Sequence, residues 1–328
     1  MKTSIIVVGI VLIVLVVGVA GLYMTGYFTP APTTIRIGYL LGDLHHLALH
    51  VAIANNYFDQ SGLKVELYEF INGPTLMQHF VAGELDFAYV GAPPAITARA
   101  NAMSSGNVSY LPVVVGCANL EGSALVVNPN VITSVADLNG KKIGTPGSGT
   151  IQDIMLSIYM TNHNLTLTKY PGSIANLPLQ FGRGEIDGFI GWETAPSIAV
   201  INFSASVLLT SHDMMPNHQC CVLVVSSAYL AAHPDIVTKM VNVHNSAHDF
   251  INAHPTEAKQ IAANYTGLSM PVIDMAFSRI VYTKIVNVES IRTFVSNMIQ
   301  LGVIKTLNAS QVDSFVSGFV DTNYAITQ

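Results

Sequence analysis

The sequence predicts an α/β protein built from two similar lobes that face a shared cleft. Strand and helix patterns alternate over most of the chain, which indicates mostly parallel sheets with helices on both faces. One unit occurs twice, because GELDFAYVGAPPAI at residues 83–96 returns as GEIDGFIGWETAPSI at residues 184–198. Each copy is typical of a helix stop, a buried strand and the start of a new helix. Since open α/β sheets bind ligands at the carboxyl ends of their strands, the duplication predicts a cleft between the lobes.

The N-terminus has the pattern of a membrane anchor. Residues 5–24 are an almost unbroken apolar run without a charge, long enough to cross a bilayer core. Lys2 precedes the run, so the binding domain is expected outside the cytoplasm, on a single-pass protein of the cell membrane. A cleaved signal peptide is the alternative, although the run is longer than is usual for one. We therefore expect an anchor over residues 1–27 and a Pro/Thr linker over residues 28–34.

The next segment predicts the first part of lobe I, residues 35–120. Short apolar runs are separated from helical patterns by Gly, Pro and Asn, as is usual where a strand leads into a helix. Strands are expected at 35–40, 64–68, 86–90 and 111–117, and helices at 47–55, 75–82 and 94–103.

The second lobe, residues 121–220, continues the same alternation. Strands are expected at 123–127, 142–145 and 168–170, and helices at 135–140, 150–161 and 174–181. A further strand at 221–226 and a helical tail return the chain to lobe I, which is completed by residues 221–328. The chain thus crosses between the lobes twice, which predicts a two-strand hinge.

Charge and cysteine content exclude some classes of protein. The net charge is −6 and only 10% of the residues are charged, so we expect no nucleic-acid partner. Cys117, Cys220 and Cys221 are an odd number with two adjacent, which does not describe a disulfide framework.

A glycine-rich turn, GTPGSGTIQD at residues 144–153, joins a strand to a helix. Such a turn presents backbone N–H groups at a positive helix end, where an anion or a carbonyl can bind. The turn lacks the patterns of nucleotide-binding loops, which disfavours a nucleotide. The alternative is a capped turn without a ligand.

The segment LGDLHHLALH at residues 41–50 follows the first strand at the binding edge of the sheet. Asp43 can cap the following helix. His45 and His46, with Cys220 and Cys221 near them in space, would form a transition-metal shell, since thiolate and imidazole suit zinc, copper and iron. Their spacing matches no compact metal motif, so we expect no metal or cofactor and keep these four residues as candidate ligands. The alternative is one histidine lining the cleft while the others pack.

Three further residues have a candidate role. His218 beside Cys220 could activate a cysteine nucleophile, but no orienting partner or oxyanion hole is visible, so no catalytic residue is expected. Trp192 and Glu193 follow the second repeated strand and are expected to contact a ligand, as an aromatic wall and an acceptor. For Trp192 the alternative is core packing.

Taken together, these motifs resemble the nitrate/sulfonate/taurine-type family of ABC-transporter substrate-binding proteins, which also contains thiamine-pyrimidine synthases and thiamine-precursor binders. The ordered motifs that carry the resemblance are IRIGYL at 35–40, ANNYF at 54–58, GLKVE at 62–66, GELD at 83–86, SVADLNGKKIG at 134–144 and GEID at 184–187.

The resemblance implies a type II periplasmic-binding-protein fold with a mobile cleft. Its partners would be a small-molecule ligand and an ABC permease with its ATPase. The ligand-binding residues, with His45, His46 and His218 added, would be Gly42, Asp43, Asn72, Gly73, Gly91, Ala92, Pro93, Gly147, Ser148, Gly149, Thr150, Gln152, Trp192 and Glu193. None of these loops contains Arg or Lys, so an anion would rest on helix N-termini, on hydroxyls, or on His45 and His46 if protonated.

The expected function is therefore that of a solute-binding component, not an enzyme, which captures a small polar organic or oxyanion solute of the sulfonate, nitrate or taurine kind. The alternative is a metal-linked enzyme like the thiamine-pyrimidine synthases, or a thiamine-precursor binder that uses the His and Cys residues. The synthases carry a Cys-rich, metal-linked motif, and residues 218–221 resemble it only faintly.

Overall fold

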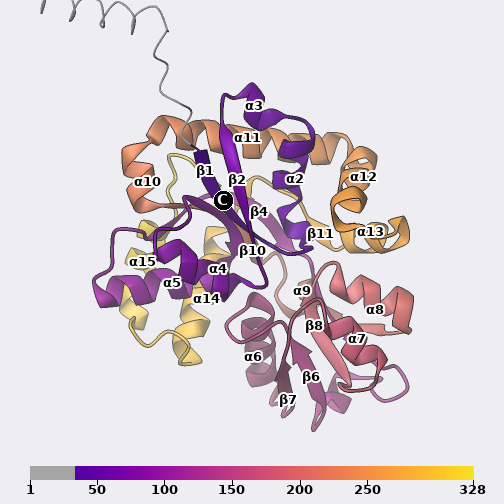
Figure 1. The fold of residues 1–328 in the computed structure, drawn as a ribbon. Coiled ribbons are helices and arrows are strands. Elements are labelled where there is room, and N and C mark those ends of the chain that lie inside the picture. Colours follow the sequence, from indigo (N-terminus) through magenta and orange to yellow (C-terminus); the bar gives the residue numbers. More distant parts are fainter. Residues whose placement is uncertain (1–33) are drawn as a thin grey trace, which may run out of the picture.

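Two α/β lobes, each organised around its own sheet, make up the computed structural model, which describes residues 34–328 (Figure 1). The expected anchor at residues 1–27 and almost all of the expected linker lie outside the described residues. Within residues 34–328 no helix is long and apolar enough to cross a membrane.

Lobe I contains a six-stranded mixed sheet. β1 pairs in parallel with β2 and β3, whereas β10 runs antiparallel to β3 and β4. The strands in spatial order are β11 (Ile280–Val281), β4 (Pro112–Glu121), β10 (Gln219–Ser226), β3 (Phe87–Gly91), β1 (Thr34–Leu40) and β2 (Lys64–Phe70). Every residue of β3, β4 and β10 is buried, which explains their nearly continuous apolar sequences.

Helices cover both faces of this sheet, and the C-terminal helices belong to this lobe (Figure 1). The first group is η1 (Leu44–His46), α2 (Leu47–Ala54), α3 (Tyr57–Gln60), α4 (Gly73–Val81) and α5 (Ala92–Ser105). The second group is α10 (Ser227–Ala232), α11 (Pro234–Ala253), α12 (Pro255–Thr266), α13 (Met270–Phe277), α14 (Val288–Gln300), η3 (Ala309–Gln311) and α15 (Val312–Phe319). A short parallel pair, β12 (Ile285–Val286) and β13 (Ile326–Thr327), lies near the C-terminus.

Lobe II contains a five-stranded sheet. Its strands in spatial order are β7 (Thr168–Pro171), β6 (Lys142–Thr145), β8 (Gly188–Trp192), β5 (Ser123–Val127) and β9 (Ser206–Thr210). Its helices are η2 (Val135–Leu138), α6 (Ile151–His163), α7 (Leu177–Gly182), α8 (Ala195–Phe203) and α9 (Ser211–Met214).

The duplicated sequence unit folds the same way in both lobes. Gly83 and Gly184 end their helices with φ of 81° and 71°, a left-handed conformation that glycine adopts without a steric penalty. Each is followed by a fully buried strand, β3 or β8, and then by a helix with Pro in its first turn. The prediction of two similar α/β units is confirmed.

The chain crosses between the sheets twice, and one side chain joins the two crossings. Glu121 ends β4 with φ of 59°. Its Oε1 accepts hydrogen bonds from the Asn217 N–H and from His212 Nδ1, both at 2.7 Å. Because Asn217 lies on the return crossing, Glu121 ties the two connections together.

The structure differs from the prediction mainly at edges. Strand β9 was not predicted, because its residues are half-buried or exposed and give a weak pattern. The strand predicted at 111–117 extends to Glu121, which brings it to the crossing. The helix predicted from residue 174 begins at Leu177, just before Pro178.

Candidate functional site

A small buried cavity lies between the lobes at the carboxyl ends of their strands, where the duplication predicts a cleft. Its volume of about 20 Å³ is close to the space of one water molecule. The lining residues come from both lobes and are Leu40, Asp43, His45, Gly73, Gly91, Pro94, Thr150, Ile151, Gln152, Trp192 and Cys221.

Three helices begin at this cavity. Gly73 opens α4, Gly91 precedes α5, and Thr150 caps α6. The first N–H groups of a helix have no partner within it, and the helix dipole makes that end positive. Among the lining residues that the structure describes there is no Lys or Arg. The cavity therefore favours an anionic group through backbone rather than through cationic side chains.

Asp43 is the buried carboxylate of the cavity, with 1% of its surface exposed. Its Oδ1 accepts the His45 N–H at 2.9 Å, so it caps η1 as the sequence predicts. Burial raises the pKa of this carboxyl to about 6, although His45 acts in the opposite direction. The tyrosine hydroxyls of Tyr265 and Tyr282 donate to the carbonyls of Asp43 and Leu44, at 3.2 and 2.9 Å, and hold this loop.

His45 points one ring nitrogen at the hinge and the other at the thiols. Its Nε2 lies 2.7 Å from the carbonyl oxygen of Gly122, which can only accept, so Nε2 carries a proton. Its Nδ1 lies 3.4 Å from Cys220 Sγ, 3.7 Å from Cys221 Sγ and 3.4 Å from Asp43 Oδ1. Burial lowers the pKa of His45, but Asp43 and Cys220 outweigh this effect and raise it to about 10.

The adjacent thiols of Cys220 and Cys221 lie 4.0 Å apart at the start of β10. Neighbouring strand residues normally point to opposite faces, but the pairing of β10 with β4 shifts register on both sides of Cys221. This irregularity turns both sulfurs toward His45. Burial raises the pKa of both thiols, but for Cys220 the hydrogen bond with Cys221 and the charge on His45 act against burial, and the pKa of Cys220 is lowered well below its usual range.

His218 and His46 occupy different sides of this cluster. His218 Nδ1 lies 2.8 Å from the Met215 carbonyl, so its Nε2 keeps the lone pair, and this buried atom has no hydrogen-bond partner. His46 Nδ1 instead accepts the Leu40 N–H at 3.2 Å, so its proton lies on Nε2, 3.7 Å from Asp43 Oδ2. His46 thus faces Asp43 as a donor and has no free lone pair.

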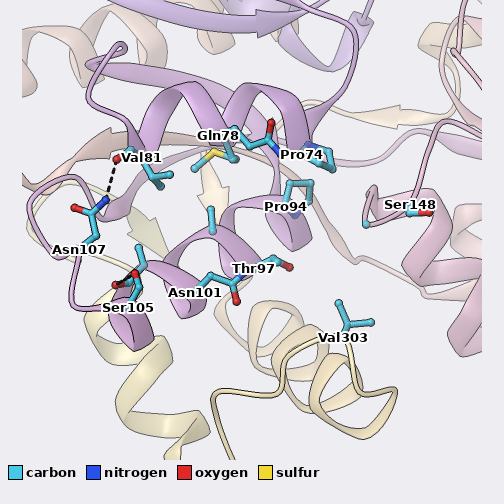
Figure 2. A pocket seen from close by; sticks show the side chains of 14 residues that line it. Pro74, Gln78, Val81, Pro94, Thr97, Asn101, Ser105, Asn107, Ser148 and Val303 are labelled. Atoms are coloured by element: carbon cyan, nitrogen blue, oxygen red, sulfur yellow. Dashed lines mark hydrogen bonds between the residues drawn. The ribbon is translucent and has the colours of Figure 1, made fainter.

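Part of the predicted ligand-binding set lines the cavity, and so does Cys221 of the candidate metal ligands. The predicted ligand-binding residues at the cavity are Asp43, His45, Gly73, Gly91, Thr150, Gln152 and Trp192. The other predicted ligand-binding residues do not line the cavity. They are Gly42, His46, Asn72, Ala92, Pro93, Gly147, Ser148, Gly149, Glu193 and His218. Ser148 and Gly149 line a separate groove of about 470 Å³, where Pro74 and Gln78 of α4, Thr97 and Asn101 of α5, and Val303 face one another (Figure 2). No titratable side chain lines this groove, so we assign the site to the smaller cavity.

Glu193 lies beside the cavity but is engaged by another side chain. Its buried carboxylate forms an ion pair with Arg279 of lobe I and accepts the Ser197 hydroxyl at 2.8 Å. Sequence reasoning missed Arg279, because no local pattern marks a partner 86 positions away. Glu193 therefore joins the two lobes through Arg279.

Known proteins support the architecture and the family. The sequence pattern of the NMT1-like family matches residues 29–266. A protein of Brucella abortus named a binding protein is 26% identical over 241 residues, 70% of this chain and 71% of that one. One from Bacillus subtilis, named an aliphatic sulfonates-binding protein, is 24% identical over 66% of this chain and 64% of its own. The 4-amino-5-hydroxymethyl-2-methylpyrimidine phosphate synthase of Aspergillus parasiticus is 25% identical over 65% of each chain.

A solved structure shows the same fold. The periplasmic nitrate-binding protein of Synechocystis PCC 6803 superposes with a TM-score of 0.77 at 16% identity, covering 90% of this chain and 88% of that one. The chain therefore has the α/β periplasmic-binding-protein fold. Because the family pattern spans well over half of the sequence, this protein belongs to the NMT1-like family.

Proposed function

We propose that this protein is the solute-binding component of an ABC importer and holds a small solute in the cavity between its lobes. The observation that carries the proposal is the convergence of three helix N-termini and Trp192, from both lobes, on one buried cavity. Family membership and relatives named as binding proteins support the same function.

The chemistry of the cavity favours a solute with a small anionic group, such as nitrate or a sulfonate. The helix N-termini can bind such a group without Lys or Arg. Asp43 also lines the cavity and would favour an amine, so a zwitterion of the taurine kind matches both features. A sulfonate is larger than the present cavity, so its entry requires the lobes to separate by hinge motion at the crossings near Glu121 and Asn217.

The partners follow from this function. The protein would deliver its solute to an ABC permease and its ATPase, outside the cytoplasm. Residues 1–27 would anchor it to the cell membrane as a single helix, for which the charge-free apolar run at 5–24 is the support. The proposal includes no catalytic residue.

A variant at Gly91 tests the site. A Cβ added at Gly91 would lie 3.4 Å from Pro94 and 3.8 Å from Ile151 of the other lobe, and its φ of −59° suits any residue. Gly91→Val should therefore fold but overpack the closed cleft by about 1 to 3 kcal/mol, which weakens solute binding about 5- to 150-fold. Gly172→Val is the matched control, because Gly172 follows β7 in lobe II, does not line the cavity, and would bring its Cβ within 3.3 Å of Gln180 and 3.4 Å of Leu177 of the same lobe.

The measurement is a thermal-shift screen of detergent-solubilised protein with nitrate, taurine, alkanesulfonates, bicarbonate and thiamine precursors. A solute at about 100 times its Kd should stabilise the wild type by about 2.7 kcal/mol. The proposal fails if no solute stabilises the protein, or if Gly91→Val and Gly172→Val bind a solute equally well.

The second candidate function is that of a metal-linked enzyme like the pyrimidine phosphate synthases. The observation that favours it is the cluster of His45, Cys220 and Cys221 beside the cavity. Tightly bound iron together with turnover of a pyrimidine precursor would establish this function in place of the first.

A further inference from the structure

Five exposed asparagines belong to a sequence pattern that solute binding does not use. Each is followed two residues later by Ser or Thr, with no Pro between them, which is the acceptor pattern for asparagine-linked sugar. The five are Asn107, Asn164, Asn202, Asn264 and Asn308. None of them lines the cavity between the lobes. Sugar at these positions would therefore leave the solute site open.

The backbone around each asparagine decides whether an enzyme can use it. The pattern requires the hydroxyl as well as the amide, so an acceptor must present both side chains together. In a helix, residues two positions apart do not face each other. In an extended segment they point to the same side. The folded protein therefore divides the five asparagines into two groups.

Asn202 and Asn264 lie in helices. Asn202 is in the last turn of α8, and Asn264 is inside α12. In α12 the hydroxyl of the pattern is already used, because Thr266 Oγ1 donates to the Ala262 carbonyl at 2.7 Å. The amide and the hydroxyl of this pattern can meet only if the end of α12 unwinds.

The other three asparagines lie outside helices. Asn107 is in the loop that follows α5, Asn164 ends α6 with φ of 53°, and Asn308 is the cap of η3. The hydroxyl residues that complete these three patterns are exposed as well, and they are Ser109, Thr166 and Ser310. At these positions both groups of the pattern are open to an enzyme.

Asn308 shows the contact between the two groups directly. Its Oδ1 accepts hydrogen bonds from the Ser310 N–H at 3.0 Å and from the Ser310 hydroxyl at 2.6 Å. The amide and the hydroxyl of this pattern are thus already together in the folded protein. Within the described residues Asn308 Nδ2 donates no hydrogen bond, so this nitrogen is free to react.

We propose that Asn107, Asn164 and Asn308 carry asparagine-linked sugar chains and that the two helical asparagines do not. In the transfer, the asparagine Nδ2 forms a bond to C1 of the first sugar of a lipid-phosphate-linked donor. The bond between C1 and the phosphate oxygen breaks, and one Nδ2 proton passes to the released phosphate. The proposal rests on the placement of both lobes outside the cytoplasm that the proposed function includes, because the pattern is used on exported chains.

The composition of the surface is consistent with this role. Only 10% of the residues are charged, against about 25% in an ordinary soluble protein. Sugar chains would supply the hydration that charged side chains supply on most surfaces.

Glycopeptide mapping of the full-length protein from the membranes of its natural host tests the proposal. Proteolytic peptides are analysed by mass spectrometry for sugar fragment ions and for the modified residue. The reference is the same chain made in the cytoplasm of a host without asparagine-linked glycosylation. We expect sugar at Asn107, Asn164 and Asn308. Asn323, an exposed asparagine in a turn with Ala325 two residues later, is the control within the chain and should carry none.

Variants at Asn308 separate modification from structure. Asn308→Asp keeps the oxygen that caps η3 but removes the nitrogen that would accept sugar. Ser310→Ala removes the hydroxyl, and Ser310→Thr keeps it. Asn308→Asp and Ser310→Ala should lose the sugar at this position, whereas Ser310→Thr should retain it. Sugar that persists at Asn308 in Ser310→Ala would contradict the role of the hydroxyl and overturn the proposal.

The native protein decides the proposal without any variant. Absence of sugar from all three sites would overturn it, and so would sugar on a helical site or on Asn323 at the same occupancy as on Asn308. Labelling of intact cells with a membrane-impermeant amine reagent tests the placement separately. Labelled lysines on a sugar-free protein would show that the lobes lie outside the cytoplasm although the modification fails. A thermal shift by a solute in sugar-free protein would show that the solute-binding function stands on its own.

Discussion

Replacing Arg279 by Met should destabilise the protein more than the loss of an exposed charged side chain does, because Arg279 pairs with a buried carboxylate. Arg279 lies between α13 and β11 in lobe I and pairs with Glu193 of lobe II. The Glu193 side chain is 0% exposed, and the Arg279 side chain is 16% exposed. Arg279 also donates to the Ser197 hydroxyl at 3.0 Å, and that hydroxyl donates to Glu193. The variant would therefore leave a buried carboxylate with hydroxyl and backbone partners only.

The magnitude follows from the burial of Glu193. Breaking a buried ion pair on one side costs about 3 to 5 kcal/mol, and we expect the lower end because water reaches part of Arg279. Removing the charge as well, in Arg279→Met with Glu193→Gln, should restore all but about 1 kcal/mol, since the amide oxygen can still accept from Ser197. Glu193→Gln should therefore regain about 2 kcal/mol in the Arg279→Met background, whereas in the wild type it should regain nothing because the ion pair is intact.

Urea unfolding followed by circular dichroism and by tryptophan fluorescence measures these changes. Trp192, the single tryptophan of the chain, is the neighbour of Glu193. Lys284→Met is the control, because Lys284 pairs with Asp249 at 2.6 Å but both side chains are well exposed, at 32% and 64%. That loss should cost less than about 1 kcal/mol. The reasoning is refuted if Arg279→Met loses no more stability than Lys284→Met, or if the double variant is as unstable as Arg279→Met.

Two predictions concern pH. His244 is buried between the Tyr89 hydroxyl and the Cys117 carbonyl, and burial lowers its pKa to about 4. The stability that neutral His244 contributes is present above the unfolded pKa of about 6.5 and is lost as the pH falls toward 4, so His244 alone should account for about 2 kcal/mol of the loss of stability between pH 7 and pH 5. His244→Gln should reduce this slope in calorimetry, and an unchanged slope would contradict the account. His212 has a raised pKa through its hydrogen bond to Glu121 and the charge of that carboxylate. The stability that protonated His212 contributes is present below pH 6.5 and is lost as the pH rises through its folded pKa. Amide hydrogen exchange near the crossings, corrected for intrinsic rates, should therefore become faster over that pH range. In His212→Gln the corrected exchange rate should not change with pH over the same range.

The fold could be predicted where local patterns determine it. The repeated unit contains its own helix stop, buried strand and helix start, so Gly83 and Gly184 mark matching positions in both lobes. Asp43 was predicted as a helix cap, because capping depends on the neighbouring residues alone. The convergence of the glycine-rich turn and the segment after the first strand follows from the rule that each α/β lobe presents the carboxyl ends of its strands to the cleft between the lobes.

The rest of the site depends on contacts that no local pattern records. The sequence suggested Cys220 and Cys221 as candidates, but adjacent residues in a regular strand point apart, and only the irregular pairing of β10 turns both toward His45. Both rings carry a proton on Nε2, and what distinguishes them is Nδ1, which faces the thiols in His45 but accepts the Leu40 N–H in His46. Each of these contacts requires the assembled structure.

Tryptophan fluorescence during solute titration tests the central claim most directly. Because Trp192 lines the cavity and is the only tryptophan in the sequence, a solute held between the lobes must change its surroundings. A solute found by thermal shift should change the emission of the wild type saturably, with one molecule per chain, and Gly91→Val should shift the titration to higher concentration while Gly172→Val does not. The account is contradicted if calorimetry shows that the solute binds but Trp192 emission does not change and Gly91→Val binds it with the same affinity as the wild type. The solute would then bind elsewhere.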